Sequence, residues 1–131
     1  MKRHPLQTPL GTETEIVRAL LTSIDEIAYV VRLSARDPTR GTVQLVSRRV
    51  NQILGRRPGD FLRDPGLWMR MIHPEDVPAV ARSTRGILAS RKPGTRIYRV
   101  RHARTDRYRW IDDRVVPMLD RRGRVVGIVG A

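Results

Sequence analysis

The chain has 131 residues, a length that suits one compact domain, and it contains no cysteine, which excludes thiol chemistry and disulfide stapling. Its formal net charge is +13, with 26 basic residues against 13 acidic ones, yet the arginines are spread along the whole sequence and only Lys2 and Lys92 are lysines. We therefore disfavour a nucleic-acid partner, which usually requires a clustered basic face. No apolar run approaches the roughly 18 residues of a membrane helix, and we expect a cytoplasmic protein without a signal peptide.

The first predicted element is an amphipathic helix over residues 13–24, after a proline-containing tail. Thr12 and Glu15 have the spacing of a capping box, which marks a helix start. Four apolar residues then recur at helical period, namely Ile16, Ala19, Leu20 and Ile24. We expect residues 1–22 to form a tail with a flanking helix and residues 23–131 to form the folded domain. The apolar stripe is the expected interface with a second copy of the chain.

A hairpin and three short helices are predicted next. The expected elements are strands at residues 28–33 and 42–47, then helices at 48–54, 59–62 and 66–71. Residues 37–41 between the two strands have strong turn chemistry. Gly55 follows the first short helix, where the chain needs a left-handed conformation, so we predict a positive φ at this residue.

The second half of the sequence predicts one long helix and three strands. The helix covers residues 74–90 and begins in effect near Asp76, because Pro78 is tolerated only in the first turn. We expect the Asp76 carboxylate to accept backbone N–H groups at this helix start. Strands follow at residues 95–104, 108–118 and 125–129. The order of elements indicates an α+β fold, one antiparallel sheet with helices on one face.

Two features of these strands bear on the sheet. In the last strand both the odd-numbered and the even-numbered residues are apolar, so both of its faces should be covered and the strand should lie centrally in the sheet. Asp112 and Asp113 are adjacent on a strand and point to opposite faces, so they cannot share a proton as an acid–base pair. We instead expect them to pair across strands with arginines such as Arg99 or Arg101.

The sequence offers no catalytic or metal-binding pattern. His4, His73 and His102 are far apart, and neither a nucleophile elbow nor a Gly-rich phosphate loop is present. We therefore predict no catalytic residues, no metal and no enzyme activity. His73 is interpreted as a residue that fixes the turn into the long helix.

A series of short motifs resembles a known family. In chain order they are Asn-Gln-Ile-Leu-Gly at 51–55, Pro-Gly-Asp-Phe-Leu at 58–62, Asp-Pro at 64–65 with Trp68, Ile-His-Pro-Glu-Asp at 72–76, Trp-Ile-Asp-Asp-Arg at 110–114 and Asp-Arg-Arg-Gly at 120–123. The ordered set resembles the PAS (Per-ARNT-Sim) sensor domain of the common bacterial type, over roughly residues 23–131. This resemblance implies a five-stranded antiparallel sheet in the order 2-1-5-4-3, with helices that form a cavity over its inner face.

The resemblance also implies a function. It suggests a sensory input domain of a bacterial signalling protein, which passes ligand or partner binding to an effector such as a histidine kinase or a cyclic-dinucleotide enzyme. The implied pocket residues are Ile53, Leu54, Trp68, Met71, Val80, Tyr98, Val100, Trp110 and Ile128. Haem is disfavoured because the long helix has no histidine, and a cysteinyl flavin because the chain has no cysteine. The resemblance still allows the binding of a small non-covalent ligand.

Two alternatives from other functional classes remain at this stage. One is a dimerisation module with a filled core and no ligand, which should show no cavity. The other is a nucleic-acid-binding module, driven by the positive charge, which should show one continuous arginine face and a steep salt dependence. We expect a homodimer that is covalently linked to an effector domain.

Overall fold

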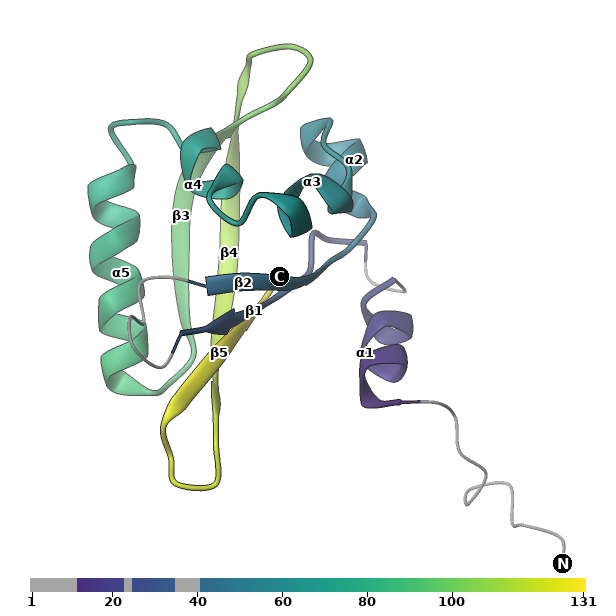
Figure 1. Ribbon diagram of the computed structural model, residues 1–131. Helices are drawn as coiled ribbons and strands as arrows, with labels where there is room; N and C mark the ends of the chain where they lie inside the picture. The colour runs from purple at the N-terminus through teal and green to yellow at the C-terminus, as the bar shows by residue number, and fades with distance from the viewer. Residues whose placement is uncertain (1–11, 23–24, 35–40) are drawn as a thin grey trace, which may run out of the picture.

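The computed structural model describes residues 12–22, 25–34 and 41–131. Its elements, shown in Figure 1, are α1 (Glu13–Thr22), β1 (Tyr29–Leu33), β2 (Gly41–Val46), α2 (Arg49–Leu54), α3 (Pro58–Arg63), α4 (Leu67–Met71), α5 (Val77–Ser90), β3 (Gly94–Arg101), β4 (Tyr108–Leu119) and β5 (Val125–Gly130). Each predicted element is present. The most visible boundary difference is that β3 ends at Arg101, because His102 N donates to the Arg107 carbonyl (2.8 Å) and closes the turn.

The five strands form one antiparallel sheet in the order β2-β1-β5-β4-β3. The fold prediction is therefore confirmed, and so is the central position of β5, which lies between β1 and β4. In Figure 1 the chain begins the sheet with β1 and β2, leaves it for the helices, and returns through β3 and β4 before β5 closes the gap.

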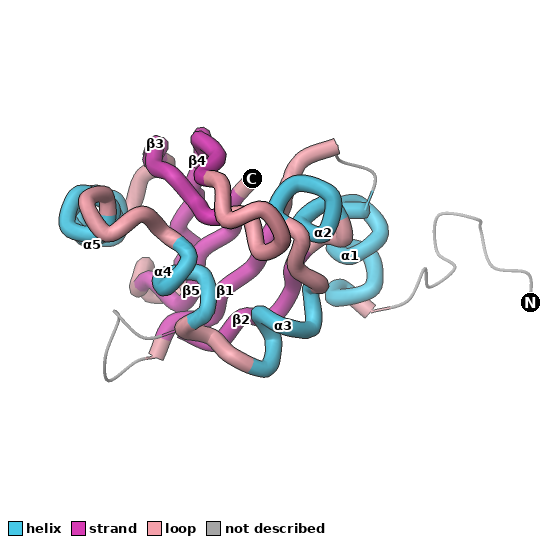
Figure 2. Tube along the Cα trace, turned by 90° about the horizontal axis from the view of Figure 1, so that it is seen from above, coloured by secondary structure: helices cyan, strands magenta, loops and turns pink. Residues whose placement is uncertain are grey.

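Helices α2 to α5 cover one face of the sheet, which we call the inner face, as Figure 2 shows from above. Between helices and sheet lies a cluster of buried side chains: Val50, Leu54, Phe61, Met71, Ile72, Val80, Tyr98 and Val100. A smaller cluster joins α5 to the middle of the sheet through Ile87, Val115 and Ile128. Burial of these apolar side chains is the main force that holds the helical layer on the sheet.

Helix α1 begins as predicted. Thr12 N donates to Glu15 Oε2 (3.1 Å) and Glu15 N donates to Thr12 Oγ1 (3.2 Å), so both halves of the capping box are formed. In Figures 1 and 2 this helix lies at the edge of the molecule, beyond α2. Ile16 and Leu20 are exposed, whereas Ile24 and the predicted turn at residues 37–40 lie outside the described residues.

The expected role of Asp76 as a helix cap is wrong. Its backbone is already helical (φ −91°, ψ −18°), and its side chain makes no capping hydrogen bond. The carboxylate instead accepts from Arg99 N (2.9 Å), Arg99 Nε (2.9 Å) and Arg99 Nη2 (2.8 Å) on the neighbouring strand β3. Asp76 therefore ties the start of α5 to the edge of the sheet.

This contact leads to a prediction for the titration of Asp76. The Arg99 side chain, followed by its backbone N–H, lowers the carboxyl pKa from 3.8 to about 2. Because the folded-state pKa is lowered, the pair stabilises the protein above pH 3.8, and this contribution is lost as the pH falls through about 2. NMR titration of Asp76 should therefore show a midpoint near 2 in the wild type and a higher midpoint in Arg99→Gln, which removes the guanidinium but keeps the backbone N–H. The control Arg101→Gln should leave the midpoint unchanged; an Asp76 midpoint unaffected by Arg99→Gln would contradict the assignment.

Candidate functional site

A cavity of about 290 Å³ lies between the inner face of the sheet and helices α3 to α5. Its walls are mainly apolar and come from β1, β2, β5 and the three helices; they include Ile27, Val31, Val43, Phe61, Leu88 and Ile128. Four polar side chains also line it: Tyr29, Thr84, Arg85 and Arg96. An apolar enclosure with a few polar groups is the usual form of a small-molecule site.

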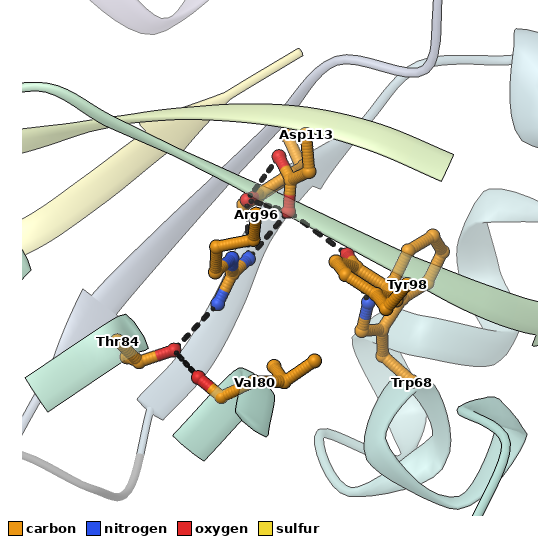
Figure 3. A network of polar contacts seen from close by, with 7 residues as sticks. Trp68, Val80, Thr84, Arg96, Tyr98 and Asp113 are labelled. Carbon is orange, nitrogen blue, oxygen red and sulfur yellow. Dashed lines mark hydrogen bonds and ion pairs between the residues drawn. The ribbon is translucent and has the colours of Figure 1, made fainter. Parts of the chain in front are cut away.

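The polar floor of this cavity is built on a buried ion pair. Arg96 and Asp113 lie directly opposite each other on β3 and β4, and their side chains are 9% and 2% exposed. Arg96 Nη2 donates to Asp113 Oδ2 at 2.5 Å. Figure 3 shows the two side chains meeting at the sheet, with Thr84 approaching from α5.

Two tyrosines complete the partners of Asp113. Tyr29 OH donates to Asp113 Oδ1 and Oδ2 (both 2.9 Å), and Tyr98 OH donates to Asp113 Oδ2 (2.8 Å). Burial, and then the negative charge of Asp113, raise the pKa of both phenols well above the ordinary value of 10.0. Both hydroxyls therefore stay protonated at neutral pH and act as donors. Trp68 Nε1 in turn donates to Tyr98 OH (3.0 Å), which links the cluster to α4.

The Arg96 guanidinium distributes its remaining hydrogen bonds between a helix and a strand. Nη1 donates to Thr84 Oγ1 (2.8 Å), and Nη2 also donates to Tyr29 OH (2.9 Å). The Thr84 hydroxyl is in turn bonded to the Val80 carbonyl (2.8 Å). Among the described residues only Arg96 Nε in this cluster lacks a partner. The opposite charges of Arg96 and Asp113 offset each other, so the floor is polar but nearly neutral.

The structure separates the predicted pocket residues into three groups. Trp68 and Ile128 line the cavity. Six others belong to the core beside it, either fully buried or packed against it: Leu54, Met71, Val80, Tyr98, Val100 and the half-buried Ile53. Tyr98 nevertheless takes part in the site, because its hydroxyl bonds to Asp113 and to Trp68.

The expected place of Trp110 in the pocket is wrong. Tyr98 is fully buried on the inner face and pairs with Ile111, so the neighbouring Trp110 points to the opposite face, which we call the outer face. Its side chain is 67% exposed, and the Arg99 guanidinium lies 5.3 Å from the centre of its ring system. Apolar residues occur at both the odd-numbered and the even-numbered positions of β4, so the sequence pattern alone could not show which face of the sheet Trp110 occupies.

The sequence interpretation missed the polar floor. Asp113 was expected to pair with Arg99 or Arg101, yet its partner is Arg96. The available signal was that Arg96 shares its parity with Tyr98 and Val100, an unusual place for an arginine unless it is paired. Tyr29 and Thr84 had no such signal, because only the tertiary structure brings β1 and α5 to this point.

The described residues contain no group of three or more His, Cys, Asp or Glu side chains that could hold a metal ion. None of the described residues that line the cavity is a histidine, and the chain has no cysteine for a flavin adduct, so these residues do not fit a haem or a cysteinyl flavin. In the described part of the chain no helix has the length and apolar character needed to cross a membrane.

The family model described as "PAS fold" matches residues 44–131, about two thirds of the chain. The chain belongs to the PAS family. A search of curated protein sequences found no match. The limits that we predicted for the PAS domain, residues 23–131, stay a prediction.

Solved structures show the same fold. The N-terminal domain of a diguanylate cyclase with PAS/PAC sensor from Marinobacter aquaeolei is 24% identical, with a TM-score of 0.62 over 79% of this PAS domain's chain and 90% of that one. A domain of a putative light and redox sensing histidine kinase from Haloarcula marismortui is 18% identical, with a TM-score of 0.63 over 87% and 94%. The Rhodobacter sphaeroides LOV protein is 19% identical, with a TM-score of 0.70 over 88% and 62%.

Proposed function

We propose that this PAS domain is the sensory input unit of a cytoplasmic bacterial signalling protein. A small, mainly apolar molecule would bind in the cavity, and the domain would pass that event to a covalently linked effector without catalysing a reaction. The observation that carries this proposal is the cavity of about 290 Å³ with apolar walls and a fixed polar floor. A histidine kinase or a cyclic-dinucleotide enzyme is the proposed effector, in line with the proteins to which two of the similar domains belong.

Tyr29 supplies a physical route from the cavity to the ends of the domain. It lines the cavity, begins β1 and pairs with Gly130 at the end of β5. A methyl group added at Gly130 would lie 2.1 Å from Tyr29 Cζ, so the ring rests directly on the last strand. A ligand that shifts Tyr29 therefore displaces backbone at the start and at the end of the folded domain together.

The ligand-binding proposal can be tested by filling the cavity. Ala81 lines the cavity on α5, whereas Ala79 on the same helix is exposed. Native mass spectrometry of freshly purified protein should find a bound small molecule in the wild type and in Ala79→Phe but not in Ala81→Phe, because the added ring occupies the site. An absorption spectrum of the same sample should show neither a Soret nor a flavin band. Wild-type protein that retains no molecule, and whose Tm no compound from a library of small acids and alcohols raises, would contradict the proposal.

A second role, homodimerisation, is favoured by the outer face of the sheet. Ile97, Trp110 and Val116 are 67%, 67% and 40% exposed there, on strands β3 and β4. Ile97 and Trp110 are diagonal neighbours on the β3–β4 pair, and clustered exposed apolar side chains often mark an interface. We propose that two copies associate through this face together with the α1 stripe that contains Ile16, Ala19 and Leu20.

Sedimentation can test the dimer. Trp110→Glu should weaken association by at least about tenfold, because a charge would be buried in the interface. The matched control is Leu62→Glu, since Leu62 is also exposed and apolar but lies on α3 on the helical side. Removal of residues 1–24 should also weaken the dimer or cause aggregation. A protein that sediments as a monomer at high concentration, with and without residues 1–24, would rule out this role.

A further inference from the structure

A second cavity adjoins the first and differs from it in charge. It measures about 360 Å³ and is lined by Leu33, Leu88, Ala89, Arg91, Arg124 and Val125. Leu33 and Leu88 line both cavities, so the two adjoin at these side chains. The walls of the first cavity are mainly apolar, whereas the second, at the end of α5, has two arginines among its six lining residues. We call this second cavity the basic recess.

The positive charges around this boundary are not all neutralised. Arg124 Nε is paired with Asp120 Oδ2 at 2.9 Å. Arg91 in the basic recess and Arg85 at the rim of the first cavity are exposed, and neither has an ion pair within the described residues. Arg91 is held in place by its left-handed backbone (φ 59°) at the end of α5, where its N–H donates to the Ile87 carbonyl.

Arg96, in the floor of the first cavity, attracts an anion less than the exposed Arg85 and Arg91 do. Arg96 is already offset by Asp113, and its Nη groups are bonded to Asp113, Tyr29 and Thr84. Only Arg96 Nε has no partner within the described residues of this cluster, and an anionic group placed there would lose its hydration against a charge that Asp113 already offsets, which is costly. A negatively charged group is therefore better placed at Arg85 and Arg91, outside the apolar cavity, than at Arg96 inside it.

We propose that the ligand of this site is an anionic amphiphile: an unbranched or ring-containing apolar body in the first cavity, with one carboxylate outside it, in the positive field of Arg85 at the rim of that cavity and Arg91 in the adjoining basic recess. This inference rests on the proposed ligand-binding function and specifies its ligand class. At about 30 Å³ per water-sized unit, the first cavity holds an apolar body on the order of ten non-hydrogen atoms. A free medium-chain carboxylate has these dimensions.

The experiment compares decanoate with decanol, which have the same chain length but differ in charge, at neutral pH and below the concentration at which either aggregates. Trp68 lines the cavity and Trp110 lies on the outer face, so a Trp110→Phe background leaves Trp68 as the only fluorescent tryptophan. Titration of this variant should show decanoate binding at least about fivefold more tightly than decanol. Added salt should reduce the difference, because exposed charges are screened.

Charge-removal variants locate the head group. Each exposed arginine contributes roughly two- to fivefold in affinity, as surface ion pairs do, so Arg85→Gln/Arg91→Gln should abolish the preference for decanoate, measured as the ratio of the decanoate and decanol affinities of the same variant. The charge-matched control Arg107→Gln/Arg121→Gln lies outside both cavities and should behave as the parent protein. Along a series from hexanoate to tetradecanoate, affinity should rise about fourfold per methylene, equivalent to about 0.8 kcal/mol, until the cavity is full near ten carbons.

The outcomes separate this inference from the function on which it rests. Equal binding of decanoate and decanol, or no effect of Arg85→Gln/Arg91→Gln, would overturn the anionic head group while the cavity remains a binding site. Binding to phosphatidylglycerol vesicles without binding of monomeric decanoate would overturn a free carboxylate in favour of a membrane lipid. If neither probe binds, the inference is overturned; the proposed function also fails only if native mass spectrometry finds no ligand.

Discussion

Replacement of Asp113 by alanine should lower the free energy of unfolding by about 3–5 kcal/mol, since it leaves the buried Arg96 charge without its partner. Asp113 accepts hydrogen bonds from Arg96, Tyr29 and Tyr98, and it is 2% exposed, so water cannot take its place. Urea denaturation monitored by circular dichroism measures the loss, with the midpoint and slope reported separately.

Two comparisons isolate the cause of this loss. Asp112→Ala changes the adjacent residue, which is exposed on the outer face, and should alter the unfolding free energy by no more than about 0.5 kcal/mol. The double variant Arg96→Met/Asp113→Leu removes both charges and should be more stable than Asp113→Ala, because no unpaired ion remains buried. An Asp113→Ala protein that loses less than about 1 kcal/mol would show that the ion pair is not buried as described.

The second large effect is expected at Gly55. Its φ of 73° confirms the positive φ predicted from sequence, and a methyl group built on it would lie 2.7 Å from His102 Cε1. The His102 ring cannot move freely, because His102 Nδ1 accepts from Arg104 N (3.1 Å). Gly55→Val should therefore lower the free energy of unfolding by about 2 kcal/mol or more, from backbone strain and from this collision. Urea denaturation measures the change in the free energy of unfolding, and thermal unfolding measures the accompanying change in Tm.

Gly86 is the matched control for this substitution. It lies in the interior of α5, and a methyl group built on it would meet no atom within 4 Å. Gly86→Ala should raise the free energy of unfolding by about 0.5–1 kcal/mol, because alanine loses less conformational freedom in a helix than glycine does. The two substitutions should therefore change the free energy of unfolding in opposite directions. An unchanged Tm in Gly55→Val would contradict the strain and the collision expected at Gly55.

The order of elements and the central place of the last strand could be predicted because they leave local signals. The spacing of apolar residues and the turn-forming residues mark the helices and strands. In β5 (Val125–Gly130) the residues that point to either face of the sheet are all apolar. The strand order needed the family resemblance, since hydrophobic pattern does not say which strand pairs with which. The positive φ of Gly55 was predictable because one local position, the end of α2, requires it.

The polar floor could not be predicted because it depends on register. The pairing of Arg96 with Asp113 follows from the alignment of β3 with β4, which in turn is set by a turn in which Asp106 adopts a positive φ of 56°. A shift of β4 by one residue would have placed Asp113 on the outer face, away from Arg96. Trp110 was misplaced for the same reason: the face of β4 that it occupies is decided by the register with Tyr98.

The position of β5 has a consequence for how the protein forms on the ribosome. β1 and β2 are made first and β3 and β4 much later, yet the two pairs meet in the sheet only through β5, which is the last of the five strands to be synthesised. Roughly a hundred residues separate β1 from β5, so at about 5–20 residues per second the edge of β1 waits about 5–20 s for its partner. During that time its backbone N–H and C=O groups are open to pairing with another chain. Truncation before Val125 would leave two half-sheets that cannot join, which makes the C-terminal strand the step that commits the nascent chain to its native topology.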